Sequence, residues 1–150
     1  MDEATRRQII EILDAHRIMT VATLRPDGWP QATTVGYGND GTDIYFLCAT
    51  DSQKAENLAR DNRVSATING DKDQMLEIKG LSLAARAHRL TDEAEGRKAI
   101  DLLISRYPPQ EGLDLEMPQP SDVALFRLEP VVVSVLDYSK GFAHSDLVSM

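Results

Sequence analysis

The sequence has little of what several classes of protein require. Cys48 is the one cysteine among 150 residues, so the chain can form no internal disulfide, and a lone thiol suits a reducing cytoplasm. No apolar run approaches the roughly 18 residues of a membrane-spanning helix, and the acidic, amphipathic N-terminus is unlike a secretory signal peptide. We therefore expect a cytoplasmic protein without a membrane segment.

Positive charge is also scarce. There are 16 Lys and Arg against 24 Asp and Glu, which gives a net charge of −8, whereas nucleic-acid surfaces need clustered positive charge. His16, His88 and His144 are distant in sequence and have no Cys or His at ligand spacing, so we predict neither a nucleic-acid partner nor a metal site. The hydrophobic content of 42% is enough to bury a core, and the length predicts one domain over residues 1–150.

Common catalytic and nucleotide-binding motifs are missing as well. There is no G-x-x-x-x-G-K-[ST] and no G-x-S-x-G. Residues 36–41 match G-x-G-x-x-G, but a strand pattern follows where a dinucleotide site needs a helix, so a hairpin turn is favoured. Cys48 stands in an apolar strand without a basic neighbour in sequence, which favours a buried thiol over a nucleophile.

What the chain does have is short apolar strands separated by tight turns. Helical spacing of apolar residues predicts helices over residues 3–16, 52–61 and 92–106. Strands are predicted over 18–24, 30–37, 44–48, 63–68, 74–90 and 122–136, with turns at 25–28 and 38–43 and a proline-bearing loop over 107–120. A phase slip at Gly80 predicts a β-bulge there, and Pro130 predicts a bulge or an edge position. Six strands joined mostly by turns indicate an antiparallel barrel or a strongly bent sheet.

The segment from Thr50 to Lys54 opens the second predicted helix. Thr50 and Gln53 fit a capping box, which leaves Ser52 and Lys54 as free side chains in the first turn. Unpaired amides and the positive end of the helix dipole lie at such a turn, so a hydroxyl and an ammonium beside them can hold a phosphate. A solvated lysine at a helix start is the competing interpretation, and these residues alone leave the two about even.

The run from Ile18 to Ile68 resembles the pyridoxamine 5'-phosphate oxidase-like family of FMN-binding split barrels. The shared order is strand, PDG-type turn, strand, turn, strand, S-x-K helix and N-x-R-V strand. The resemblance is good over about the first 90 residues and looser over the end of the chain. It implies a mainly β fold, a six-stranded antiparallel split barrel that forms a homodimer, with FMN in a groove at the subunit interface.

The resemblance also implies roles for particular residues. The strand at 32–35, with Thr33, Thr34 and Val35, would line the flavin, and Tyr37 lies further along. Leu47 and Cys48 would lie near the cofactor, Ser52, Gln53 and Lys54 would hold its phosphate, and Lys79 would approach from the side. The tail over 138–150 would shape a substrate site through Lys140, Phe142 and His144, unless it is a frayed terminus, which is equally compatible with its polar sequence.

Some positions depart from the family pattern. The vitamin-processing oxidases have arginine where Ala32 and Gln53 stand and lysine where Tyr37 stands, and they end in an Arg- and Trp-rich segment. These departures argue against pyridoxamine-phosphate oxidation and remove charge-assisted phosphate donors. We expect an FMN-binding oxidoreductase with an unidentified small-molecule substrate. The alternatives are a non-catalytic module that binds flavin, deazaflavin or haem for storage, sensing or stress protection, and a dimeric barrel that has lost its cofactor.

Overall fold

The computed structural model describes residues 1–108, 112 and 118–150. In this part of the chain, eight strands form one antiparallel sheet: β1 (Ile18–Leu24), β2 (Pro30–Gly36), β3 (Gly38–Asp40), β4 (Asp43–Cys48), β5 (Arg63–Asn69), β6 (Lys79–Arg89), β7 (Ala124–Asp137) and β8 (Ser145–Ser149). The helices are α1 (Glu3–Asp14), α2 (Gln53–Arg60) and α3 (Glu93–Ser105), with short 3-10 turns η1 (Met75–Glu77), η2 (Pro120–Asp122) and η3 (Tyr138–Lys140). The mainly β, antiparallel architecture expected from the sequence is confirmed.

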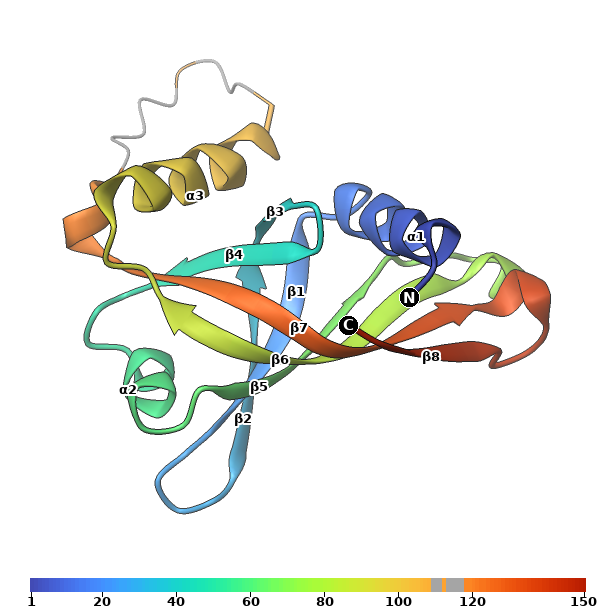
Figure 1. Ribbon diagram of the computed structural model, residues 1–150, viewed down its shortest axis with the longest axis horizontal. Coiled ribbons are helices and arrows are strands. Elements are labelled where there is room, and N and C mark those ends of the chain that lie inside the picture. Colours follow the sequence, from blue (N-terminus) through green and yellow to red (C-terminus); the bar gives the residue numbers. More distant parts are fainter. Residues whose placement is uncertain (109–111, 113–117) are drawn as a thin grey trace.

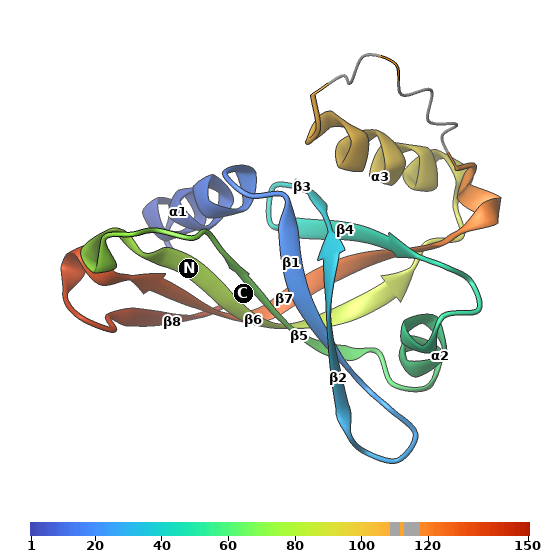
Figure 2. The ribbon, with the colours of Figure 1, turned by 180° about the vertical axis from the view of Figure 1, so that it is seen from behind.

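The sheet is curled into half a barrel around its longest strand, β7 (Figure 1). Its order is β2-β1-β5-β6-β7-β4-β3, and β8 lies beside β7. One edge of β7 pairs with β6, while its other edge is shared by β4, along Ala124–Leu128, and β8, along Val132–Leu136. The β1–β2 hairpin projects from the body of the molecule, as Figure 2 shows from behind.

The bulge in this sheet lies on β7. The register between β6 and β7 shifts between Ala84 and Ala85, where β7 carries one extra residue, Val131, next to Pro130. Pro130 is therefore at a bulge, as predicted. The bulge expected at Gly80 is absent, because Gly80 pairs in regular register with both Asn69 and Leu136; a Cβ at this position would lie 2.9 Å from the Ile68 carbonyl oxygen, so close backbone approach explains the glycine instead.

Alternation along the strands separates a core from an outer face. Inward residues of β1, β4, β5, β6 and β7, such as Val21, Phe46 and Ile68, form the main core together with Ile9, Ile12 and Leu13 of α1. A second, smaller core lies beneath α3, where Ala99 and Ile100 meet Tyr45 and Leu125 from the other face of β4 and β7. Hence α1 and α3 cover different parts of the sheet (Figure 1).

Small uncharged residues occupy the outward positions of five neighbouring strands. The strand registers align them in two rows across the sheet, and each residue is exposed or half-buried. We call this surface the uncharged outer face; its rows are Ala32–Ala22–Ser65–Ala84–Val132 and Thr34–Thr20–Thr67–Ser82–Ser134.

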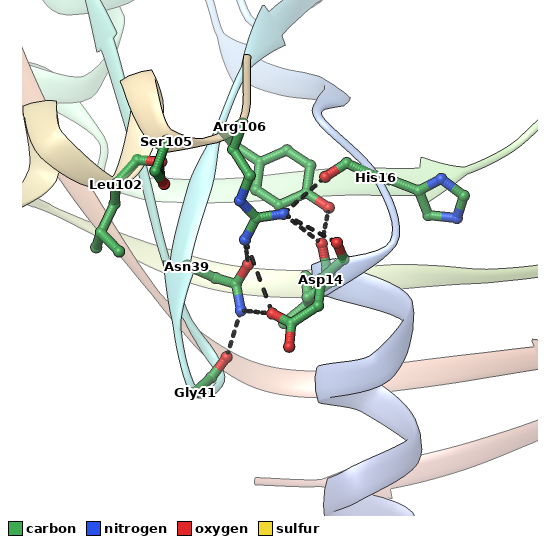
Figure 3. A network of polar contacts seen from close by, with 9 residues as sticks. Asp14, His16, Asn39, Gly41, Leu102, Ser105 and Arg106 are labelled. Atoms are coloured by element: carbon green, nitrogen blue, oxygen red, sulfur yellow. Dashed lines mark hydrogen bonds and ion pairs between the residues drawn. The ribbon is translucent and has the colours of Figure 1, made fainter. Parts of the chain in front are cut away.

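Arg106, which follows α3, ties this helix to the C-terminal end of α1 (Figure 3). Its Nη1 donates to the carbonyl oxygens of Leu13 at 3.0 Å and His16 at 2.8 Å, and its Nη2 donates to Asn39 Oδ1. The Asn39 amide in turn donates to the Asp14 carboxylate at 2.9 Å. A cation at this position is favourable because the last carbonyls of a helix lack partners within it and carry partial negative charge.

Several element boundaries differ from the sequence-based expectation. The strand predicted over 74–90 begins only at Lys79, because residues 75–77 form η1 with Met75 and Leu76 exposed. The turn predicted over 38–43 contains the short strand β3, and the tail contains η3 and β8 rather than a frayed end. Most of the loop predicted over 107–120 lies outside the described residues.

Candidate functional site

The connection from β4 to α2 carries the residues expected to hold a phosphate. Ser52, not Thr50, is the N-cap of α2: its hydroxyl accepts a hydrogen bond from the Ala55 amide at 3.2 Å. The capping box predicted for Thr50 and Gln53 is therefore wrong. Both Thr50 and Ser52 are good capping residues, and helix boundaries read from sequence are uncertain by a residue or two, so the pattern could not choose between them.

The first turn of α2 nevertheless keeps groups that can bind an anion. The Ser52 hydroxyl accepts from an amide and so retains its own hydrogen for donation. The amides of Gln53 and Lys54 lie in the first turn, where helix N–H groups have no partner within the helix. The Lys54 side chain is half-buried beside them, while Asp51 is exposed and adds an opposing negative charge.

A buried hydrogen-bond network joins α2 to β1 and β2. Asn57 is fully buried, with 0% exposure. Its amide nitrogen donates to Thr23 Oγ1 at 3.0 Å and to Gln31 Oε1 at 3.4 Å, and its amide oxygen accepts from Gln53 Nε2 at 2.8 Å. Gln53 thus bonds within the protein. The sequence analysis missed Asn57, although a polar residue at a helix position flanked by the buried Ala55 and Leu58 was the available signal.

The strand β2 points its residues to opposite faces. Thr33 and Val35 turn inward and are half-buried, while Thr34 is exposed on the uncharged outer face, so Thr33 and Thr34 cannot face the same groove. Thr33 Oγ1 is buried and has no hydrogen-bond partner among the residues that the structure describes. Such an unsatisfied group calls for an explanation, and an absent hydrogen-bonding ligand is one.

Tyr37 does not line an open surface. It is fully buried, its hydroxyl donates to the Leu13 carbonyl oxygen at 2.5 Å, and burial raises its pKa. Leu47 and Cys48 also diverge: Leu47 packs beneath α3 in the second core, whereas Cys48 is buried in the main core. Cys48 is thus the buried thiol expected from the sequence.

Lys79 and the tail residues lie at the opposite end of the sheet from α2. Lys79 pairs with Asp137 at the last residue of β7, whereas Cys48, which leads to α2, pairs with Ala124 at the first. Thirteen steps of roughly 3.3 Å separate these ends by about 40 Å along the strand. Within one chain, the structure therefore does not bring Lys79, Lys140, Phe142 or His144 together with Ser52 and Lys54.

The end of the sheet that carries Lys79 has a cavity of about 640 Å³ between α1 and η1. Its wall includes Ile12, His16, Lys72, Leu76 and Lys79. Burial and the nearby Lys72 ammonium lower the pKa of His16. The cavity combines apolar and charged groups. The charged side chains are exposed to solvent, whereas the His16 imidazole is half-buried.

The tail folds back into an ordered loop at this end. Phe142 is 74% exposed, and its ring meets Tyr138 edge-on with 5.6 Å between ring centroids. Ala143 has a positive φ of 58°, which is uncommon for a residue other than glycine. His144 Nε2 lies 3.0 Å from the Asp146 carboxylate, to which the Lys140 ammonium also comes within 3.6 Å.

Two further findings concern metal binding and membrane insertion. In the part of the chain that the structure describes, no group of three or more His, Cys, Asp or Glu residues could hold a metal ion. In the same residues, no helix is long and apolar enough to cross a membrane.

Known structures share this fold over most of the chain. A conserved hypothetical protein from Mycobacterium tuberculosis is 26% identical, with a TM-score of 0.77 over 99% of this chain and 93% of that one. A heme binding protein from Mycobacterium smegmatis is 23% identical, with a TM-score of 0.75, and a protein of unknown function from Agrobacterium tumefaciens is 29% identical, with a TM-score of 0.70. The matches cover 99% and 90% of this chain but span 59% and 57% of those two proteins.

Sequence comparison agrees with the structural likeness. No curated protein matches the chain. The family model described as pyridoxamine 5'-phosphate oxidase matches residues 5–137, which include every strand except β8 and all three helices but the first two residues of α1. The chain therefore belongs to the pyridoxamine 5'-phosphate oxidase family.

Proposed function

We propose that this protein binds FMN and is an oxidoreductase that acts on a small molecule still to be identified. The observation that carries the proposal is the anion-binding turn with Ser52 and Lys54 at the start of α2, a helix that Asn57 links to β2. On β2 the buried Thr33 hydroxyl lacks a partner in the described chain. A phosphate at the turn and a flavin ring near β2 would satisfy both. Bound FMN would supply the redox chemistry, and the protein would bind and orient it.

The residues present fit such a cofactor with modest affinity. The Ser52 hydroxyl, the Lys54 ammonium and the first-turn amides are donors suited to a phosphate. Gln53 adds no charge and already bonds Asn57. A single lysine therefore supplies the charge-assisted contact, so its removal has a large expected effect on FMN binding.

We further propose that the site is completed by a second copy of the chain. Lys79 and the tail lie at the end of β7 remote from α2. In a two-fold symmetric homodimer with antiparallel protomers these residues would reach the cofactor of the partner, and the two-fold axis would create two equivalent sites. The uncharged outer face supports this arrangement, because it exposes ten outward positions without a charge in a protein that is 27% charged.

The test is titration of the purified protein with FMN, followed by flavin absorbance and fluorescence. We expect saturable binding, and a weakening of about tenfold in Lys54→Ala, the loss of one charge-assisted hydrogen bond. Lys98→Ala is the matched control, since this exposed lysine on α3 bonds Asp40 far from the turn. Absence of flavin binding, or equal effects of the two substitutions, would contradict the proposal.

The competing function is a non-catalytic module that binds flavin, deazaflavin or haem. It is favoured by the likeness to a structure described as a heme binding protein, although at 23% identity that likeness concerns the fold. Titration with haemin, in parallel with FMN, separates the ligands. If FMN binds but is neither reduced by NAD(P)H nor reoxidised by common acceptors, the oxidoreductase proposal fails and the binding module stands.

A further inference from the structure

Asn57 is an unusual residue to bury on a short helix. It is 0% exposed on α2, between Ala55 and Leu58, which face the main core. A buried amide costs free energy unless its donors and acceptor are satisfied, so an apolar side chain would be the simpler choice for packing alone. Asn57 instead makes three hydrogen bonds, to Gln53, Thr23 and Gln31.

These partners connect the two halves of the proposed cofactor site. Gln53 is in the first turn of α2, next to Ser52 and Lys54. Thr23 is the residue of β1 that pairs with Gln31 on β2, and Gln31 lies on the same inward face as Thr33, two residues further along that strand. The amide of Asn57 therefore links the phosphate-binding turn to the strand beside which the flavin ring would lie.

We infer that Asn57 is a positioning residue that sets the separation between the phosphate-binding turn and β2, and so matches the site to a flavin that carries a phosphate. The inference rests on the proposed function. A donor set is effective when it is held within about 0.5 Å of its working geometry, and a satisfied, buried hydrogen-bond network provides such rigidity. Asn57 itself contacts neither phosphate nor ring in this scheme.

The inference predicts an effect specific to the phosphate. The strand β2 is held by seven register pairs with β1, from Ile18–Gly36 to Leu24–Pro30, so the ring-binding side persists when the network is weakened. The start of α2 then becomes less well placed, and only ligands that use it lose affinity. FMN is such a ligand, whereas riboflavin, which lacks the phosphate, is not.

The decisive experiment compares FMN and riboflavin affinity in Thr23→Val and Thr23→Ser. Valine keeps the shape of threonine but removes the acceptor for Asn57, whereas serine keeps the hydroxyl. We expect Thr23→Val to weaken FMN binding about five- to tenfold, the effect of one hydrogen bond, while riboflavin affinity changes less than about twofold. Thr23→Ser should retain the wild-type ratio of the two affinities. Asn57→Leu should show a larger form of the same effect if it folds.

Each other outcome overturns the inference. Equal weakening of FMN and riboflavin in Thr23→Val would show that the network only supports the fold, and unchanged binding of both would show that it positions nothing. If the wild-type protein binds riboflavin and FMN equally well, the phosphate turn is not used and the inference fails while flavin binding stands. If it binds neither flavin, the proposed function itself has failed.

Discussion

Arg106 shows how much one side chain contributes to joining two helices. Its guanidinium donates to three carbonyl oxygens at the end of α1 and to the Asn39 side chain. It also lies over the Tyr37 ring, 5.4 Å from the ring centroid. Its side chain is 14% exposed, so these contacts are largely shielded from water. Removing the guanidinium would leave several acceptors unsatisfied at once.

We therefore expect Arg106→Met to lower the free energy of unfolding by about 2–3 kcal/mol, because hydrogen bonds from charged donors are among the stronger ones. Urea denaturation followed by circular dichroism measures this. The matched control is Arg97→Met on α3, which breaks an exposed ion pair with Glu93 and should cost less than about 0.5 kcal/mol. Similar losses in the two variants would contradict the role assigned to Arg106.

His16 gives the protein a pH dependence near neutrality. Burial, aided by the Lys72 ammonium, lowers its pKa below the usual 6.5 in the folded state, so the unfolded chain binds more protons in the window just below that value. Stability must then decrease as pH falls from about 7 towards 5. The difference in urea midpoint between wild type and His16→Gln should shrink as the pH falls from about 7 towards 5, because only the wild type loses stability through His16. A constant difference over this range would exclude the linkage.

For single residues, the sequence predicted which residues matter better than it predicted the groups that they contact. Ser52 and Lys54 do lie at a helix start, but Ser52 is the N-cap rather than a free side chain of the first turn. Whether Ser52 or Thr50 caps the helix depended on where the chain leaves β4. The family resemblance led us to expect Tyr37 further along the strand that lines the flavin, yet its phenol donates to the Leu13 carbonyl oxygen inside the core. Asn57 and Arg106 act through segments far away in the chain, which local patterns cannot reveal.

Among the elements, β8 was the hardest to anticipate from the sequence. Its residues SDLVS are mostly polar and exposed, without the apolar, β-branched character of β1 or the alternating burial of β5. β8 forms because it pairs with β7, where the backbone groups of Val132–Leu136 would otherwise lack hydrogen-bond partners on this edge. Similarly, Leu76 and Ile78 alternate with charged residues, which predicted a strand, yet residues 75–77 form the 3-10 turn η1. Met75 and Leu76 are exposed, so alternation in this segment buries no apolar face.

A pair of substitutions tests whether β8 is as well formed in solution. Val148 packs against the main core, whereas its neighbour Leu147 is 77% exposed. We expect Val148→Ala to lower the free energy of unfolding by about 1 kcal/mol and Leu147→Ala to leave it nearly unchanged at protein concentrations where the chain is monomeric. Equal, negligible effects on thermal and urea unfolding would indicate that the tail is frayed.

For the molecule as a whole, the uncharged outer face predicts self-association. Thr67 lies in the middle of this face, between Thr20 and Ser82. A lysine there would bury a charge between two sheets, so Thr67→Lys should convert dimers into monomers at micromolar concentration. Light scattering measures the change, and Thr91→Lys, an exposed position outside this face, should remain dimeric. A wild-type monomer would rule out the shared site.

The central place of β7 has a consequence for how the chain folds as it is made. β1, β2, β5 and β6 can pair with one another early, but among the described residues β3 and β4 have no sheet partner other than each other and β7. On the ribosome, β3 and β4 must therefore wait until residues 124–137 emerge before they can join the sheet, whereas α2 can dock earlier on β1 and β2 through Asn57. Pairing across such sequence separations is slow, so the part of the sheet formed by β3, β4 and the start of β7 would be the last to mature, after the α2–β1–β2 side of the proposed cofactor site.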